Sequence, residues 1–319
     1  MLPQLLHISR AEVEALALSP AEIRAALRGA FADHAAGKLR FLPKSQLALG
    51  PGHIFQTLMA VSEPRGIAAL KWVGMGPGAA TEGLPAVSAL ICLNDLSTGH
   101  PLALMDGEEI TLLRTAGLSA LAAESLAPPA PRVLGLAGCG AQARSHLAAL
   151  RELFPSLAEV LCHSRSSASA ERLAELARGR GLSARVEPDP QALCARADIV
   201  VSTIPAAEGL TATLDARWMK PASLAVMVDL GRSWRPEGFA AFDGIATDSL
   251  AQMPHPVDAE GSPLHAVAIT SALETGLQSG GGRRAFCFRG HPAGDLAVAI
   301  LVHDRIRALK GGTPLRRDS

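Results

Sequence analysis

The stretch VLGLAGCGAQARSHLAAL at residues 133–150 decides the fold of this chain. An apolar run enters a cluster of small residues, among them Gly138, Gly140 and Ala143, and continues as an Ala-rich segment typical of a helix. These three residues form the pattern G-x-G-x-x-A, which binds a dinucleotide where it follows a strand and opens a helix. Taken alone, the pattern also suits a tight turn, so its meaning depends on the surrounding sequence.

Beyond residue 131 the sequence alternates between strand-like and helix-like segments. The strand-like runs are RVLGLAG, EVLCHS, ARADIVVSTIP and ASLAVMVDLG (132–138, 159–164, 195–205 and 222–231). The helix-like segments are AQARSHLAALRELF and SASAERLAELARGRG (141–154 and 167–181). Such alternation predicts a parallel sheet with crossover helices. The glycine pattern therefore has the right context, and we expect a dinucleotide whose pyrophosphate rests on the N-terminus of the following helix.

The N-terminal part has a different organisation. Two S-x-x-E capping boxes, beginning at Ser9 and Ser19, predict helix starts, and the second helix should begin at Pro20. Short apolar runs separated by Gly and Pro predict a meander of strands (53–63, 66–75, 85–95 and 100–107). A further helix should open near Glu108, and the Pro-rich segment APPAPR at 127–132 is typical of a linker.

Composition excludes several classes of function. The 319 residues carry a formal net charge of zero with 48% hydrophobic residues and no Tyr, which disfavours nucleic-acid and membrane-surface partners. Five cysteines without a C-x-x-C pair indicate neither a disulfide framework nor a cysteine zinc site, and the scattered histidines indicate no metal. The start lacks a basic region, and no uncharged apolar run reaches about 18 residues. We therefore expect a soluble, cytoplasmic protein.

The end of the second strand bears on the choice of dinucleotide. NAD-specific sites carry an acid there to bind the ribose hydroxyls. This chain has none at that place in EVLCHSRSSASAE; instead Arg165 is flanked by Ser164 and Ser166. A guanidinium beside hydroxyls suits a 2′-phosphate, although Arg165 could also be an ordinary solvated arginine. We expect NADPH, with NADH as the weaker alternative.

Several stretches together resemble the ornithine cyclodeaminase/mu-crystallin family. They are FLPKSQLAL, AALKWVGM, GLPAVSALICLNDLSTGHPLALMDGEEITLLRTAGLSALA, GLAGCGAQARSH, ADIVVSTIPA and FRGHPAGDLAVAILVHDRI. The third is the most specific, because a D-x-x-T-G turn is followed by LALMDG and RTAG. CHSRSSASAE is similar to the NADPH-using members rather than to the cyclodeaminases, which carry Asp there.

The resemblance implies an α/β fold in two parts. A Rossmann-type, doubly wound parallel sheet should occupy residues 129–293. A discontinuous α+β substrate and dimerisation domain should comprise residues 1–128 and a last helix within 294–319. The resemblance also implies a homodimer formed through the strand meander. Its chemistry is hydride transfer between a nicotinamide cofactor and a carbon that bears nitrogen beside a carboxylate.

Carried over residue by residue, the family's carboxylate-binding cations fall on Lys44, Lys71 and Arg114. A guanidinium can clamp a carboxylate through two bonds, and holding the carboxylate orients the imine carbon for hydride. Lys44 departs from the family, which usually has Arg there, and so loses the bidentate geometry. Gln56 or Thr57 should face the substrate, because alternation along a strand turns only one of them inward.

A second departure concerns the catalytic Asp of the cyclodeaminases. That residue follows a glycine by two positions, but here Ser233 stands two residues after Gly231. Ketimine-reducing members resemble this chain in having Ser there. Asp229, two residues before Gly231, is a candidate to stabilise an iminium cation, although an acid ending a buried strand is as often a turn or capping residue.

Other candidates have simpler interpretations. His53 and His291 could donate a proton, but a single histidine more often has a structural role. Asp295 matches an aspartate at the start of the family's last helix, where capping is the simpler account. The residues expected to bind the cofactor are Gly138, Gly140, Ala141, Gln142, Ala143, Ser164, Arg165, Ser166, Thr203, Gly231, Arg289 and Gly290.

The function we expect is NADPH-dependent reduction of 1-pyrroline-2-carboxylate or 1-piperideine-2-carboxylate to L-proline or L-pipecolate. Lys71, Arg114 and Asp229 are the candidate catalytic residues. Alternatives are ornithine or lysine cyclodeamination, an alanine dehydrogenase-like reaction, and a non-catalytic, NADPH-dependent ligand-binding role. Segment 248–267 is shorter than its family counterpart and rich in Pro and His, so the exact imine stays open.

Overall fold

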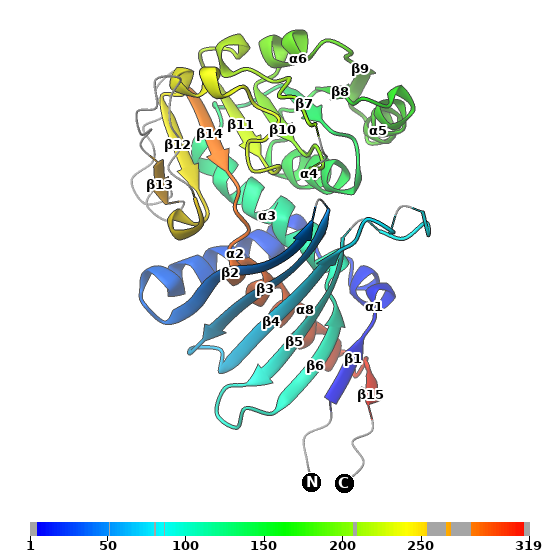
Figure 1. Cartoon of the computed structure of the whole chain (residues 1–319), viewed down its shortest axis with the longest axis vertical. Helices are drawn as coiled ribbons and strands as arrows, with labels where there is room; N and C mark the ends of the chain where they lie inside the picture. Colours follow the sequence, from blue (N-terminus) through cyan, green and yellow to red (C-terminus); the bar gives the residue numbers. More distant parts are fainter. Residues whose placement is uncertain are drawn as a thin grey trace. The chain divides into compact units, whose positions relative to one another are not determined.

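The computed structural model describes residues 5–50, 52–79, 81–85, 87–206, 209–253, 266–268 and 282–315. The chain forms two compact units (Figure 1): unit 1 comprises Met1–Thr115 and His291–Ser319, and unit 2 comprises Ala116–Gly290. The predicted boundaries lay at 128/129 and 293/294. The first division instead falls inside a continuous helix, α3 (Glu108–Leu126), because its second half packs into unit 2. Most of the unusual segment 248–267 lies outside the described residues.

Unit 1 contains a seven-stranded sheet in the order β15-β1-β6-β5-β4-β3-β2. Its strands are β1 (Leu5–Ile8), β2 (Leu39–Gly50), β3 (His53–Ser62), β4 (Ile67–Met75), β5 (Ser88–Asp95), β6 (Pro101–Asp106) and β15 (Thr313–Leu315). The antiparallel succession from β2 to β6 confirms the predicted meander. The sequence did not predict β1 and β15, which extend the sheet from the two ends of the chain.

Helices cover one face of this sheet. They are α2 (Pro20–Ala35) and α8 (Pro292–Ala308), which Figure 1 shows behind the strands of unit 1. The short helix α1 (Arg10–Ala15) follows β1 along the chain. Both predicted capping boxes are present, since Ser9 and Ser19 each accept the backbone N–H three residues on. Alternation along β4 buries Lys71 on the helix-covered face and leaves Trp72 exposed on the other.

Unit 2 is built on an eight-stranded sheet in the order β13-β12-β14-β11-β10-β7-β8-β9. Every neighbouring pair is parallel, which confirms the predicted Rossmann-type sheet. The strands are β7 (Val133–Ala137), β8 (Glu159–His163), β9 (Ser183–Val186), β10 (Ile199–Ser202), β11 (Ser223–Met227), β12 (Gly244–Thr247), β13 (Ala266–Ala268) and β14 (Arg283–Cys287). In addition to the second half of α3, the described part of unit 2 contains the helices α4 (Ala141–Leu153), α5 (Ser167–Gly179) and α6 (Pro190–Arg196). Short 3-10 turns span Ala216–Trp218, Pro236–Ala241 and Leu250–Gln252.

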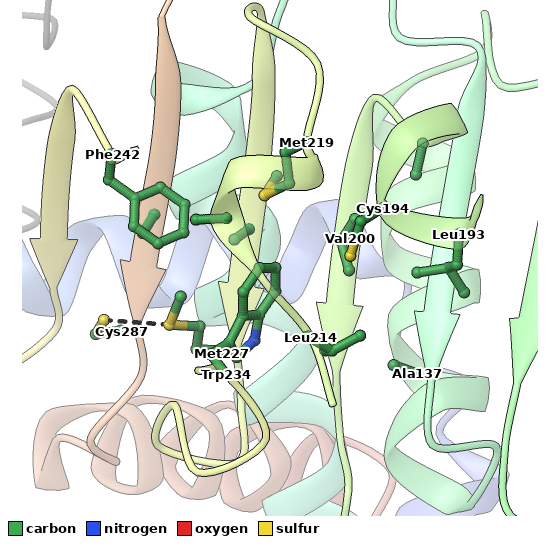
Figure 2. Packing of buried hydrophobic residues seen from close by; sticks show 14 of the residues in the cluster. Ala137, Leu193, Cys194, Val200, Leu214, Met219, Met227, Trp234, Phe242 and Cys287 are labelled. Atoms are coloured by element: carbon green, nitrogen blue, oxygen red, sulfur yellow. Dashed lines mark hydrogen bonds between the residues drawn. The ribbon is translucent and has the colours of Figure 1, made fainter. Parts of the chain in front are cut away.

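An apolar cluster holds the central strands of unit 2 together. Figure 2 shows Trp234 and Met227 in the middle of this cluster, with Val200 and Leu214 beside them. The Cys287 thiol lies 3.5 Å from the Met227 sulfur. All residues of β10 and β11 are buried, and the candidate cofactor site begins beyond the carboxyl end of β10. Among the described residues, no helix combines the length and apolar character that a bilayer span requires.

Candidate functional site

The strand order of unit 2 reverses between β7 and β10, because β8 and β9 extend the sheet on one side and β11 on the other. In open parallel sheets, ligands bind at such a switch point, beyond the carboxyl ends of the strands. Gly138 follows β7 and Thr203 follows β10. The Thr203 backbone N–H donates to the Ala137 carbonyl at 2.7 Å, and its hydroxyl donates to the Gly138 carbonyl at 3.1 Å. The glycine loop is therefore held against β10 at the switch point.

Position 138 admits only glycine. Its φ is +89°, in the region that L side chains rarely adopt. A Cβ built there would lie 2.9 Å from the carbonyl carbon, the carbonyl oxygen and Oγ1 of Thr203. The close approach of two backbone segments explains this glycine without reference to any ligand.

Position 140 has the opposite character. Gly140 precedes α4 with an ordinary φ of −87°, and a Cβ there would meet no atom within 4 Å. No side chain caps the N-terminus of α4, so its first-turn N–H groups have no capping oxygen from the N-cap residue. The Gln142 Oε1 atom is buried and has no partner among the described residues, whereas the Ala143 side chain is fully buried. Uncapped N–H groups beside open space fit the pyrophosphate of a dinucleotide.

The loop after β8 carries the predicted cofactor-selecting residues. Ser166 caps α5 by accepting the Ser169 N–H, and Arg165 is exposed beside it. Ser164 is half-buried, and no acid stands between β8 and α5. Arg172, one turn into α5, donates to the Ser169 hydroxyl at 3.0 Å. The loop thus offers hydroxyls and two guanidinium groups.

Asp229 is buried in a hydrogen-bonded turn after β11. It accepts the Ser202 hydroxyl at 2.8 Å, the Gly231 N–H at 3.2 Å and the Ser233 hydroxyl. The Trp234 indole N–H donates to Ser202 at 3.0 Å, which closes the cluster. Burial raises the pKa of Asp229 above its usual range, although the two hydroxyls oppose this shift. These contacts correspond to the turn-residue alternative, and a role of Asp229 on the substrate stays a prediction.

In unit 1, Lys71 and Arg114 meet at one carboxylate. The Lys71 Nζ atom donates to Asp295 Oδ1 at 2.7 Å and to the Thr111 hydroxyl at 3.3 Å. The Arg114 Nε atom lies 3.0 Å from the same Asp295 oxygen. All three charged side chains are at most 6% exposed. Burial, reinforced by the Arg114 charge, lowers the pKa of Lys71 to about 8, while Asp295 opposes the shift.

The capping role expected for Asp295 is wrong. The helix begins at Pro292, and its N-cap is His291, whose Nδ1 accepts the Ala293 N–H at 3.0 Å. Asp295 therefore lies within the first turn of α8, where its side chain binds the two cations. The sequence offered only one signal for this, the presence of Asp295 within the resemblance stretch FRGHPAGD.

Strand pairing decides which of Gln56 and Thr57 shares the face of Lys71. Leu58 pairs directly with Lys71, so Gln56, two residues earlier, lies on the same face. Thr57 lies on the opposite face, paired with Trp72. The Gln56 amide donates to the Gln46 side-chain oxygen at 2.7 Å.

Lys44 also belongs to this part of the sheet. It stands at an irregularity of β2, between the paired residues Leu42 and Ser45, and is half-buried. Its positive charge adds a small contribution to the lowered pKa of Lys71, after burial and the Arg114 charge. The structure therefore brings Lys71 and Arg114 together at Asp295, to which sequence analysis gave only a capping role. It also adds Thr111, which sequence analysis missed, and it places Lys44 in the same sheet.

The remaining candidates have structural contacts. The His291 ring lies 4.0 Å from Phe41 between ring centroids, and burial lowers its pKa to about 3, so the ring is uncharged near neutral pH and does not act as an imidazolium acid. His53 packs near Phe55, with ring centroids 5.8 Å apart.

Two residues after β14, Arg289 and Gly290, were expected to bind the cofactor, but their backbone N–H groups already donate hydrogen bonds within the protein. Asp248, which sequence analysis missed, accepts the Arg289 N–H at 2.6 Å and the Gly290 N–H at 2.8 Å. These backbone donors therefore hold a loop of unit 2, and a contact of either residue with the cofactor stays a prediction.

Comparisons with known proteins agree on one family. The model of the ornithine cyclodeaminase/mu-crystallin family matches residues 5–233. An alanine dehydrogenase from Archaeoglobus fulgidus is 36% identical over 215 residues, which are 67% of this chain and 64% of that protein. A Delta(1)-pyrroline-2-carboxylate/Delta(1)-piperideine-2-carboxylate reductase from Azospirillum brasilense is 34% identical over 193 residues, 60% of each chain. Each alignment thus spans less than two thirds of the relative's own length.

A solved structure extends the likeness to the whole chain. An archaeal alanine dehydrogenase dimer with bound NAD superposes with a TM-score of 0.84 at 28% identity. The superposition covers 99% of this chain and 100% of that one. Both units described above therefore have counterparts in that structure.

Proposed function

This chain belongs to the ornithine cyclodeaminase/mu-crystallin family, and we propose that it reduces a cyclic ketimine carboxylate with a nicotinamide dinucleotide. The observation that carries the proposal is the buried cluster of Lys71, Arg114 and Asp295, with Lys44 nearby. Two full positive charges against one carboxylate leave a buried excess of positive charge. Such an excess is costly unless an anion compensates it, and the substrate carboxylate is that anion.

The residues of unit 1 suit the remaining chemistry. A bound nicotinamide supplies the hydride that the imine carbon accepts. Lys71 and Arg114 hold the carboxylate, with Lys44 assisting. A Lys71 pKa of about 8 also suits a proton donor that works near neutral pH, because a catalytic acid is most effective when its pKa lies near the working pH. The ring nitrogen needs such a proton, since an iminium accepts hydride more readily than a neutral imine.

The test is nucleotide oxidation with each imine. Purified protein is mixed with 1-pyrroline-2-carboxylate or 1-piperideine-2-carboxylate and with NADPH or NADH, and L-proline or L-pipecolate is identified as product. We expect turnover with at least one imine. Nucleotide binding without turnover on either imine would contradict the proposal and favour a ligand-binding role.

A second candidate is reductive amination in the manner of an alanine dehydrogenase. It is favoured by the 36% identity to the enzyme from Archaeoglobus fulgidus. Pyruvate with ammonium in the same assay tests it directly. Ornithine or lysine cyclodeamination is disfavoured, because Ser233 stands where that reaction needs an acid, and ammonia release from ornithine would reverse this view.

We also propose that NADPH is the preferred nucleotide. The support is the exposed Arg165 between Ser164 and Ser166, without an acid that would repel a 2′-phosphate. The nucleotide itself is supported at the coarser level by the open space at Gly140 and the uncapped α4.

Arg165→Asp should therefore raise the KM for NADPH by about 10–100-fold and the KM for NADH by less than about threefold, because only NADPH carries the repelled phosphate. Steady-state kinetics with both nucleotides measure this difference. Arg151→Asp makes the same charge change at the far end of α4 and should alter neither constant. Equal effects of Arg165→Asp on both nucleotides would mean that Arg165 does not contact the phosphate.

We further propose that the protein is a homodimer formed through the uncovered face of the unit 1 sheet. On this face Met59, Leu70, Trp72 and Leu90 are 40–48% exposed, and strand pairing places them side by side. Trp72 stacks on Phe55 with ring centroids 5.6 Å apart. A contiguous apolar patch on a sheet face is typical of a protein interface.

Trp72→Glu should convert the dimer to monomers at micromolar concentration, because it inserts a charge into the centre of the patch. Sedimentation velocity measures the change. Leu309→Glu adds the same charge at an exposed leucine after α8 and should leave the dimer intact. A Trp72→Glu protein that stays dimeric would place the interface elsewhere.

A further inference from the structure

The two carboxylate oxygens of Asp295 have different surroundings. Oδ1 receives both cations, with Lys71 at 2.7 Å and Arg114 at 3.0 Å. Oδ2 is fully buried and has no hydrogen-bond partner among the residues that the structure describes. The whole side chain is only 3% exposed. Buried polar atoms in native proteins almost always have a partner, so an unsatisfied carboxylate oxygen at a binding site calls for a donor from the ligand.

The cluster has a charge pattern that matches one class of molecule. Lys71 and Arg114 suit an anion, and the unsatisfied Asp295 oxygen suits a cationic N–H. A 2-iminio or 2-ammonio carboxylate carries both, with the nitrogen and the carboxylate on the same carbon atom. A 2-oxo acid, or a ring with oxygen in place of nitrogen, offers the anion but neither the positive charge nor the N–H.

We propose that Oδ2 of Asp295 accepts the N–H of the substrate iminium and of the product ammonium, so that Asp295 selects nitrogen-bearing substrates. Lys71 and Arg114 then bind the substrate carboxylate. Asp295 orients these two cations through Oδ1 and accepts a hydrogen bond from the ring nitrogen of the substrate through Oδ2. This inference rests on the proposed function and assigns Asp295 a direct contact with the substrate.

A site that donates or accepts a buried hydrogen bond discriminates strongly against an analogue that lacks the partner, because its own polar atom is left unpaired. L-Proline and tetrahydrofuran-2-carboxylate form such a pair of ligands, since they differ in the ring NH₂⁺ group and the ring oxygen. We expect the protein to bind L-proline at least ~10²-fold more tightly than the oxygen analogue.

Calorimetry on the nucleotide-saturated protein measures both affinities without any need for turnover. Asp295→Asn keeps the volume, and its amide oxygen can still accept from Lys71 and Arg114, but the amide NH₂ replaces the acceptor. We expect the preference for L-proline to fall from at least ~10²-fold to less than about threefold. Binding of tetrahydrofuran-2-carboxylate should weaken less than binding of L-proline.

Thr111→Val is the matched control for a purely structural role. It removes the other hydrogen-bond partner of Lys71 and leaves Asp295 in place. We expect it to weaken both ligands by the same factor and to keep their ratio. The comparison of the two ligands on the unsubstituted protein tests the proposal even if Asp295→Asn does not fold.

The outcomes separate this inference from the proposed function. Imine turnover without a preference for L-proline, or with a preference that Asp295→Asn retains, would overturn the role of Asp295 alone. A preference for L-proline that Asp295→Asn abolishes would support that role even if neither imine is turned over, in which case only the proposed reaction fails. A protein that binds neither ligand would overturn the inference.

Discussion

Lys71→Met is expected to lower kcat/KM for the imine by about 10²–10³-fold. Lys71 is buried and contacts Asp295 at 2.7 Å, so the substitution removes a cation from the substrate carboxylate and leaves Asp295 with Arg114 only. Loss of one partner from a buried charged cluster typically costs about 3–5 kcal/mol, part of which appears as lost protein stability. Steady-state kinetics with saturating nucleotide measure the effect, and circular dichroism reports whether the variant folds.

The matched control is Lys44→Met, which removes a half-buried cation of the same group. Its effect should be smaller, about tenfold or less, because a more exposed charge interacts through a higher dielectric. Equal losses for the two variants would mean that Lys71 has no special position in the site.

The pH profile gives a second measure of Lys71. Burial lowers its pKa from 10.5 to about 8, so in the free enzyme the ammonium loses its proton as the pH rises through about 8. Because the protonated form binds the carboxylate, kcat/KM should be constant below this pH and fall above it. Lys71→Arg should move the fall to higher pH, since a guanidinium stays charged. A profile that stays flat to pH 10 would contradict a functional ammonium at Lys71.

Gly138→Ala is expected to destabilise the protein and Gly140→Ala to leave its stability almost unchanged, whereas both should weaken nucleotide binding. At position 138 the added Cβ would lie 2.9 Å from the Thr203 backbone at a φ of +89°, so strain and overlap should destabilise the protein by about 2–4 kcal/mol. At position 140 the Cβ meets no atom and the φ is ordinary, so the free energy of unfolding should change by less than about 0.5 kcal/mol.

Both variants should bind NADPH at least ~10-fold more weakly, because one displaces the loop and the other places a methyl group where the pyrophosphate would approach the α4 N-terminus. Chemical unfolding without nucleotide and calorimetric titration with NADPH measure the two quantities. Normal affinity of Gly140→Ala would show that the open space beside α4 is not the pyrophosphate site. Normal stability of Gly138→Ala would show that the Thr203 backbone, at the end of β10, moves aside for the added methyl group at little cost in free energy.

Patterns confined to one stretch of sequence were sufficient for much of the fold. The glycine pattern after an apolar run predicted β7, the turn and α4. The capping boxes at Ser9 and Ser19 predicted the starts of α1 and α2, which both carry the expected reciprocal hydrogen bonds. These features depend on residues three or four positions apart, so the local chain determines them.

The sequence contained no comparable signal for strand pairing between segments that are far apart in the chain. The edge strands β1 and β15 pair across almost the full length of the chain, and each is only three or four residues long. The linker expected at 127–132 lies outside the division between the units, because α3 continues through that division as one helix. Amphipathic periodicity predicts that a helix forms but not which core each half of it joins.

Some features of the candidate site were likewise predictable from the sequence, and others depend on contacts between distant segments. Local patterns predicted the glycine turn after β7 and the basic loop at Arg165, and the family resemblance predicted the cations of unit 1. The contact of Asp295 with Lys71, which lies 224 positions away, and the capping of α8 by His291 became visible only in the folded structure. A carboxylate at a helix start satisfies the same local pattern whether it caps the helix or pairs with a distant cation. Folding selects between the two by the cost of burying Lys71 and Arg114 without a counter-charge.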